Sequence, residues 1–238
     1  WEAAFYNVYC RAMDTNILNI APSVESVSNC LNSVFVLIKN LDNIADSKAA
    51  IIEISARISY ICAAFESVAR NHFKTSANDT SNADLKLKYT EEYHSRSIAV
   101  ANLHLIFGDY IKKYYSNELD MMKIAVVSWK SGVQYYVNDS AFYDNFIEDR
   151  KMVDNRYGAM IREFEPDYVM PAPNYDGFPE MHITIMKDRE KKSGIKTDDS
   201  SGGCYVATAV YGSYDCPEVW TLRRFRDYTL AKTWYGRS

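Results

Sequence analysis

Over most of its length, the sequence of 238 residues has few residues that break helices. Proline is absent between Pro22 and Pro166, and the glycines in that interval are Gly108, Gly132 and Gly158. Because proline in a helix interior costs about 3 kcal/mol, its absence permits long helices. Proline and glycine return after residue 166, where the character of the chain changes.

Features of several other protein classes are also missing. The five cysteines are an odd number, and no two form a Cys-x-x-Cys pair, which favours free thiols in a reducing compartment. The net charge is -4 with both signs interspersed, so nucleic acid is disfavoured as a partner. The N-terminus has no signal-peptide pattern, and no apolar run reaches the roughly 20 residues of a spanning helix. We therefore expect a cytoplasmic protein.

Motifs for metals and cofactors are lacking as well. The four histidines are scattered, without a His-Glu-x-x-His pattern or a Cys/His cluster. Gly-rich phosphate loops are absent. Glu91, Glu92 and His94 share one helical stretch, which we interpret as a solvated face. We accordingly predict no cofactor and no metal site.

Apolar residues recur at alternating spacings of three and four through the first two thirds of the chain, which is typical of helices packed along a seam. The first two seams are Val24, Val27, Leu31, Val34, Ile38 and Leu41, and then Ile51, Ile54, Ile58, Ile61, Phe65 and Val68. Joined by a short polar turn, they predict an antiparallel hairpin. Further seams are Leu103, Ile106, Tyr110 and Tyr114; Leu119, Met122, Val126, Trp129, Val133 and Tyr136; and Phe142, Phe146, Val153, Tyr157, Met160 and Phe164. We predict that residues 1–165 form an all-α, elongated helical bundle with coiled-coil-like seams.

Polar residues predict where these helices begin and end. The first helix is expected over residues 2–20, before a proline, with Ser23 as the N-cap of the second. Asp46 is expected to cap the third helix. Residues 74–82 are predicted to be a polar loop, and a break is expected at 138–140.

The C-terminal part of the sequence carries a recognisable motif. Gly203–Ser213 reads Gly-Cys-Tyr-Val-Ala-Thr-Ala-Val-Tyr-Gly-Ser, and Pro217–Asp227 reads Pro-Glu-Val-Trp-Thr-Leu-Arg-Arg-Phe-Arg-Asp. This segment resembles the bacterial CFI-box, which runs Cys-Phe-Ile-Ala-Thr-Ala-Ala-Tyr-Gly-Ser, then Pro-Glu-Val, then Leu-Arg-x-Phe-Arg-Asp. Tyr205 and Val206 stand where the family has Phe and Ile. The family pattern continues beyond residue 237, so we expect the box, residues 203–238, to be incomplete.

The box is predicted to contain one amphipathic helix that begins at Pro217. Its candidate binding residues are Trp220, Arg223, Arg224, Phe225, Arg226 and Asp227. Such a helix can dock on the bundle, bind a partner protein or lie on a membrane surface, and docking on the bundle is the preferred interpretation. Residues 166–202 are predicted to form an irregular tether with one candidate short strand over 181–186.

Cys204 is the candidate nucleophile, because it follows two glycines and precedes an Arg-rich helix that would lower its pKa. His182 is the nearby candidate base. A buried packing role for Cys204 is favoured over catalysis. The leading hypothesis is therefore a non-enzymatic bacterial interaction or scaffold protein, which self-associates or binds a protein partner. The alternatives are a cysteine-dependent enzyme or self-processing protein, and a peripheral membrane protein attached through its C-terminal helix.

Overall fold

The computed structural model describes residues 1–140, 146–174, 183–184, 187–188 and 191. The chain divides into two compact units, residues 1–199 and 200–238. The second unit lies outside the described residues, and it holds the predicted CFI-box with its amphipathic helix. All of the described residues belong to the first unit.

The described part of the first unit is an all-α bundle, which confirms the fold predicted from the seams. The long helices are α2 (Ile20–Lys39), α3 (Ile44–Asn78), α4 (Ala83–Tyr115) and α5 (Leu119–Ser140). The shorter elements are α1 (Glu2–Met13), the 3-10 turn η1 (Ile17–Asn19), α6 (Phe146–Val153), the π-helical turn η2 (Asp154–Gly158) and α7 (Ala159–Arg162).

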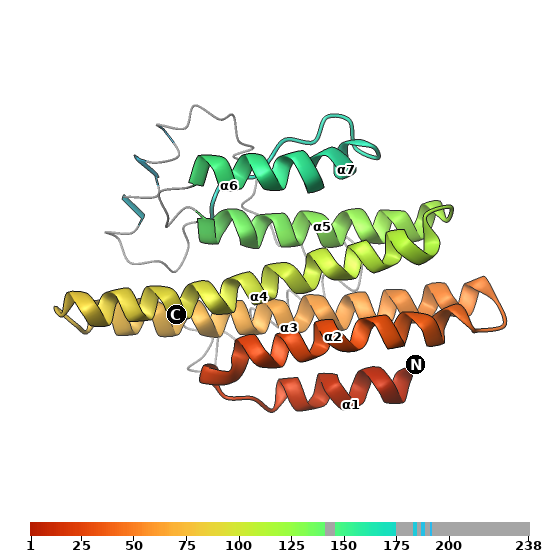
Figure 1. Ribbon diagram of the computed structural model, residues 1–238, viewed down its shortest axis with the longest axis horizontal. Helices are drawn as coiled ribbons and strands as arrows, with labels where there is room; N and C mark the ends of the chain where they lie inside the picture. The colour runs from red at the N-terminus through yellow and green to blue at the C-terminus, as the bar shows by residue number, and fades with distance from the viewer. Residues whose placement is uncertain (141–145, 175–182, 185–186, 189–190, 192–238) are drawn as a thin grey trace, which may run out of the picture. The chain divides into compact units, whose positions relative to one another are not determined.

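Helix α4 occupies the middle of the bundle, where it packs against α2, α3 and α5 (Figure 1). Helix α1 lies against α2 at one edge, and α6 lies against α5 at the other. Consecutive long helices are joined by short turns, so they run antiparallel. The α2–α3 hairpin expected from the first two seams is one of these pairs.

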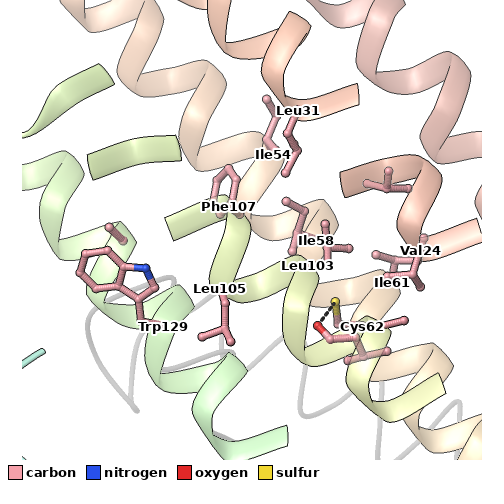
Figure 2. Packing of buried hydrophobic residues seen from close by; sticks show 14 of the residues in the cluster. Val24, Leu31, Ile54, Ile58, Ile61, Cys62, Leu103, Leu105, Phe107 and Trp129 are labelled. Carbon is pink, nitrogen blue, oxygen red and sulfur yellow. Dashed lines mark hydrogen bonds between the residues drawn. The ribbon is translucent and has the colours of Figure 1, made fainter. Parts of the chain in front are cut away.

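The seams meet in one apolar core (Figure 2). It joins Leu31 of α2, Ile54 and Ile58 of α3, and Leu103 and Phe107 of α4, all with no exposed side-chain surface. Each was predicted as a seam residue except Phe107. The core shows that the spacing of three and four identifies the buried side of each helix.

Two predicted seam positions are wrong: Val68 is 46% exposed and Leu119 is 62% exposed. In α3 the buried line continues through Ala69 and Phe73 instead. A straight helix has 3.6 residues per turn and drifts away from a strict heptad spacing, so the inward position moves by one residue over the length of α3. Leu119 is the first residue of α5, at the end of the bundle.

The predicted start of the second helix is also wrong. Helix α2 begins at Ile20, so Pro22 and Ser23 lie in its first turn. Proline is tolerated there because the first amides of a helix have no intrahelical partner. The Ser23 hydroxyl donates to Thr15 Oγ1 at 2.9 Å instead of capping a helix. The first helix, predicted to reach residue 20, ends at Met13.

Asn43, and not Asp46, is the N-cap of α3. The Asn43 side-chain oxygen accepts a hydrogen bond from the Asp46 amide at 2.8 Å. Asp46 lies in the first turn, where its carboxylate accepts from Asn43 Nδ2 at 2.7 Å. The reciprocal contact resembles a capping box, so the predicted cap Asp46 takes part in the capping without being the N-cap itself.

Two helices extend beyond their predicted ends. Helix α3 runs to Asn78, into the predicted polar loop. Helix α5 includes the predicted break at residues 138–140, because Asn138 and Asp139 are buried and hydrogen-bonded there. The Asn138 side-chain oxygen accepts from the Asn174 amide at 2.6 Å. Tertiary contacts thus outweigh the low helix propensity of these residues.

Two glycines allow α4 and α5 to approach closely. A Cβ at Gly108 would lie 2.5 Å from Trp129 Nε1, and a Cβ at Gly132 would lie 2.7 Å from the Leu105 side chain. Any larger residue at either position would therefore push the two helices apart.

The first residues of the predicted tether pack on the bundle. Met170 and Ala172 are buried, and the buried Arg150 of α6 donates to the Met170 carbonyl at 3.0 Å. Of the candidate strand over residues 181–186, Ile183 and Thr184 are described and are helical. The other four residues lie outside the described part.

Candidate functional site

The residues that the sequence singled out for catalysis or binding lie outside the described residues. They are His182, Cys204, Trp220, Arg223, Arg224, Phe225, Arg226 and Asp227. Their roles therefore remain predictions. Among the described cysteines, Cys10, Cys30 and Cys62 are free thiols. Burial raises the pKa of Cys30 to about 11 and that of Cys62 well above its ordinary value, so both thiols are protonated at neutral pH.

A buried polar cluster that the sequence analysis missed links α3 to α4. Glu66 of α3 accepts a hydrogen bond from the Tyr93 hydroxyl of α4 at 2.7 Å and one from Arg70 Nη2 at 2.9 Å. Burial, and then the Glu66 charge, raise the pKa of Tyr93 well above its ordinary value. Tyr93 therefore stays protonated and remains a donor, and this charge-assisted bond holds the two helices together.

A second buried contact links α4 to α5. The half-exposed His94 donates through Nδ1 to Oδ2 of the buried Asp139 at 2.6 Å. Burial raises the pKa of Asp139 to about 6, while the His94 hydrogen bond acts in the opposite direction. The same hydrogen bond raises the pKa of His94. The two groups therefore titrate as a coupled pair near neutral pH.

The interpretation of Glu91, Glu92 and His94 as a solvated face is correct for Glu91 only, which is exposed. His94 is held by Asp139, and Glu92 accepts from the buried Arg96 at 3.2 Å. The pairs Glu66–Arg70 and Glu92–Arg96 both show the spacing of four that joins opposite charges on one helix turn. That spacing is visible in the sequence, but it does not reveal that Glu66 and Arg96 are buried.

The Glu66–Tyr93 and His94–Asp139 contacts connect neighbouring helices. Within the described ranges, no three His, Cys, Asp or Glu side chains come together in a way that would hold a metal ion. None of the helices in the described part of the chain combines the length and the apolar character that crossing a lipid bilayer requires.

A different feature of α3 faces outward. Opposite its core side, this helix exposes a stripe of apolar and small residues, which we call the outer α3 face. Its members are Ile52, Ala56, Tyr60, Ala63, Ala64, Ser67 and Val68. Ile52, Tyr60 and Val68 are 41%, 58% and 46% exposed. Glu53 and Arg57, which are also exposed, lie among these residues.

Helix α1 borders the outer α3 face on one side. Glu53 accepts a hydrogen bond from the Tyr6 hydroxyl of α1, and Arg57 Nε donates to the same hydroxyl at 3.1 Å. These contacts tie the two charged residues of the face to α1. Helix α1 therefore contacts the face at Glu53 and Arg57.

The sequence contained a signal for this face. Ile52, Ala56, Tyr60, Ala64 and Val68 follow one another at a constant spacing of four, on a line separate from the buried seam. A surface helix normally has one apolar side. A second uncharged line on the same helix indicates a surface that is covered by something else.

No protein-family model, no curated protein and no solved structure matches this chain. The likeness to the CFI-box rests on residues from about 203 to 237 alone and remains a prediction. Function has to be inferred from the geometry of the bundle.

Proposed function

We propose that this protein is a non-enzymatic bacterial interaction or scaffold protein. The bundle presents the outer α3 face as a docking surface, and the CFI-box-like segment supplies a second docking element. The observation that carries the proposal is the exposure of Ile52, Tyr60 and Val68 on the outer side of α3.

Isolated exposed apolar residues are ordinary on protein surfaces, whereas a contiguous apolar stripe marks an interaction site. Tyr60 lies in the middle of this stripe, and tyrosine is one of the residues that contribute most energy at interfaces. Ala56 and Ala64 on either side of it leave room for the backbone of a partner helix to approach. These features together favour docking of a helix.

The rigidity of α3 supports the same conclusion. On its opposite side Ile54, Ile58 and Ile61 are fully buried in the core, so the outer residues are held in place before any partner arrives. A preorganised surface loses less conformational entropy on binding than a mobile one.

The test compares the full chain with two variants in lysate of the cells that produce it. Tyr60→Glu places a charge in the outer α3 face, and Leu87→Glu is the matched control, because Leu87 of α4 is 60% exposed and lies off that face. We expect the wild-type protein and Leu87→Glu to elute in a complex larger than the monomer and Tyr60→Glu to elute as a monomer. Equal elution of all three as monomers, with no cross-linked product, would contradict the proposal.

The cysteine-dependent alternative has a separate test, for which the bundle provides internal standards. Cys10 is exposed and Cys62 is buried, so labelling of the native chain with limiting iodoacetamide should be fast at the first and slow at the second. Labelling of Cys204 far faster than Cys10 would indicate an activated thiolate. Labelling as slow as Cys62 would exclude Cys204 as a nucleophile.

A further inference from the structure

We infer that the side of the bundle formed by α5, α6 and α7 is a binding site for an extended, proline-containing peptide. Residues 168–174 of the chain are its intramolecular occupant, which a separate peptide can replace. Helices α6 and α7 pack on α5 at the edge of the bundle away from α1 (Figure 1), so the site goes beyond the proposed function and does not depend on the outer α3 face. Five side chains hold the segment, and we call them the clamp residues: Lys130, Gln134 and Asn138 of α5, Arg150 of α6 and Arg162 of α7.

The clamp residues bind the backbone of every second residue in the segment. Alternate residues of an extended chain face the same way, so backbone groups two residues apart can all be bound from one side. A site of this kind recognises the extended shape of a peptide before it recognises any side chain. The hydrogen bonds run from Arg162 Nε to the Tyr168 carbonyl (3.1 Å), from Arg150 Nη2 to the Met170 carbonyl (3.0 Å), from Gln134 Nε2 to the Ala172 carbonyl (2.9 Å), and from the Asn174 amide to Asn138 Oδ1 (2.6 Å).

The spacing of the clamp residues on α5 matches the repeat of an extended chain. Lys130, Gln134 and Asn138 follow one another at intervals of four, so they share one side of the helix. Four helical residues advance about 6 Å, and two extended residues advance about 6–7 Å. The step from Gln134 to Asn138 therefore equals the step from Ala172 to Asn174. Gln134 Nε2 also donates to Asn138 Oδ1 at 2.9 Å, which orients both amides toward the segment.

The segment itself favours an extended form. Met170 and Ala172 are buried, whereas Val169 is 46% exposed. Each of the two buried residues comes directly before a proline, Pro171 or Pro173, and a residue before proline avoids the α region. The chain is therefore extended where the clamp residues bind it, and it loses little conformational freedom on docking.

Tyr168 adds a contact through its ring. Lys130 Nζ lies 5.0–6.0 Å class distance from aromatic faces elsewhere in the bundle only rarely, and here it is 5.7 Å from the centre of the Tyr168 ring, with the Arg162 guanidinium at 5.9 Å. Both are within the range of cation–π attraction. The peptide that fits this site thus has an aromatic residue, an apolar residue and a small residue at alternate positions, in the pattern Tyr-x-Met-Pro-Ala-Pro.

Nothing in these contacts requires that the peptide be joined to α7. The four hydrogen bonds use backbone groups that any extended peptide offers, and the buried side chains are those of Met170 and Ala172. A tethered segment competes at an effective concentration of about 1 mM. The wild-type chain should therefore bind a separate peptide weakly, and release of residues 168–174 should open the site.

The first experiment measures by fluorescence anisotropy how a labelled peptide of residues 166–174 binds the full chain. The release variant carries Met170→Glu and Ala172→Glu, which place two carboxylates where buried side chains stood and so displace the intramolecular segment. We expect it to bind the peptide at least about tenfold more tightly than the wild type, because its own segment no longer competes. A peptide that carries the same two changes should not bind.

The second experiment tests the clamp residues in the release variant. Gln134→Ala and Asn138→Ala should each weaken peptide binding about fivefold, since each removes a hydrogen bond to the peptide backbone. Lys123→Ala, an exposed change on α5, is the matched control and should leave the affinity unchanged. Tyr60→Glu should also leave it unchanged, so failure of this site and failure of the outer α3 face are distinguishable. Circular dichroism melts establish that each variant is folded.

Hydrogen exchange of the chain without added peptide provides a third readout. Gln134→Ala should speed exchange of the amides in residues 168–174, while the amides around Leu103 of α4 keep their protection. This result would show that the segment leaves its site without unfolding of the bundle.

Each outcome decides the question. Tighter peptide binding by the release variant, lost on mutation of Gln134 or Asn138, supports the inference. A folded release variant that binds no peptide at about 1 mM, a wild type that binds the peptide as tightly as the release variant, or binding that ignores both clamp variants would overturn it. Equal acceleration of exchange in residues 168–174 and around Leu103 would also overturn it, because the segment would then open only with the whole bundle.

Discussion

Helix α4 is held differently on its two sides. Toward α2 and α3, the middle of the helix packs through apolar side chains such as Leu103 and Phe107 (Figure 2). One buried polar contact, Tyr93 with Glu66 of α3, lies nearer the N-terminus of α4. Toward α5, it also uses polar pairs: His94 with Asp139, His104 with Ser128, and Asp109 with Trp129.

The difference between the two sides lies in what each contact requires. Apolar packing is non-directional and follows the buried area, so it depends on volume and changes little with pH. The polar pairs depend on direction and on protonation, and a buried polar group without its partner costs about 1–3 kcal/mol. The His94–Asp139 and His104–Ser128 contacts on the α5 side of α4 should therefore respond to pH, and the apolar packing around Leu103 and Phe107 should not.

The largest effect is expected at Trp129, which is fully buried and donates through Nε1 to Asp109 Oδ1 at 3.0 Å. Trp129→Ala should lower the free energy of unfolding by about 4 kcal/mol, because it removes a large buried ring and leaves a cavity. Urea unfolding at pH 7 measures this loss.

Gly108 provides a second test of the same contact. Gly108→Ala should cost about 2 kcal/mol in the wild-type chain, where the new methyl group meets the indole. In the Trp129→Ala background it should cost nothing, because the methyl group enters the space left by the indole. Purely additive losses in the double variant would show that the two positions are not in contact.

The next effect concerns His104, which is buried and donates through Nδ1 to Ser128 Oγ at 3.4 Å, while Ser128 donates to the His104 carbonyl. Burial lowers its pKa to about 4 from 6.5. The folded protein thus binds fewer protons than the unfolded chain in this range, and stability is lost as the pH falls from 6.5 toward 4. The loss is about 3 kcal/mol.

The variant His104→Gln should remove this dependence. As the pH falls from 7 to 4, the free energy of unfolding of His104→Gln should rise by about 3 kcal/mol relative to that of the wild type. Urea unfolding at several pH values measures the difference between the two proteins, so other titrating groups cancel. A constant difference would show that His104 is not buried in its neutral form.

The carboxyl group of Asp139 should make the stability depend on pH in the opposite direction. Its pKa is raised from 3.8 to about 6, so the folded protein binds more protons and its stability falls as the pH rises through this window. As the pH rises from 4 to 7, the free energy of unfolding of Asp139→Asn should rise by about 2 kcal/mol relative to that of the wild type. NMR titration of His94 is the second readout, because its pKa should return toward 6.5 when the carboxylate is gone. An unchanged His94 pKa would contradict the pairing.

The smallest effect is expected in the exposed turn between α2 and α3, where a polar contact is not buried. Asn43→Ala removes the N-cap of α3 and should lower the free energy of unfolding by about 1 kcal/mol, independently of pH. Asn40→Ala, in the same turn, caps no helix N-terminus and should change stability by less than half as much. Equal losses in thermal melts would show that the cap does not matter.

The seams were predictable because buried spacing is a local property of a helix. Val24, Leu31, Ile54, Ile58 and Leu103 could be assigned to the core from their intervals alone, and all five are buried. The buried pairs could not be found in this way. Glu66 and Tyr93 are 27 residues apart, and His94 and Asp139 are 45 apart, so only the folded chain brings them together.

Helix ends also differ in whether local sequence or tertiary contacts determine them. The start of α4 near residue 83 follows from local capping by Asn82, whose side chain accepts from the amides of Asp84 and Leu85. The end of α5 does not, since residues 138–140 favour a break locally and are kept helical by contacts with α4 and with Asn174. Tertiary hydrogen bonds of this kind leave no trace in the local pattern.

By itself, the sequence determined that this chain forms a bundle of long helices, because the absence of proline and the spacing of apolar residues act within each helix. The tertiary structure decided which polar residues are buried, through pairs such as His94–Asp139 whose members lie on different helices. It also decided that Tyr60 and its neighbours on α3 face outward. Both outcomes depend on which sides of α3 and α4 the other helices cover, and that depends on how all the helices pack together.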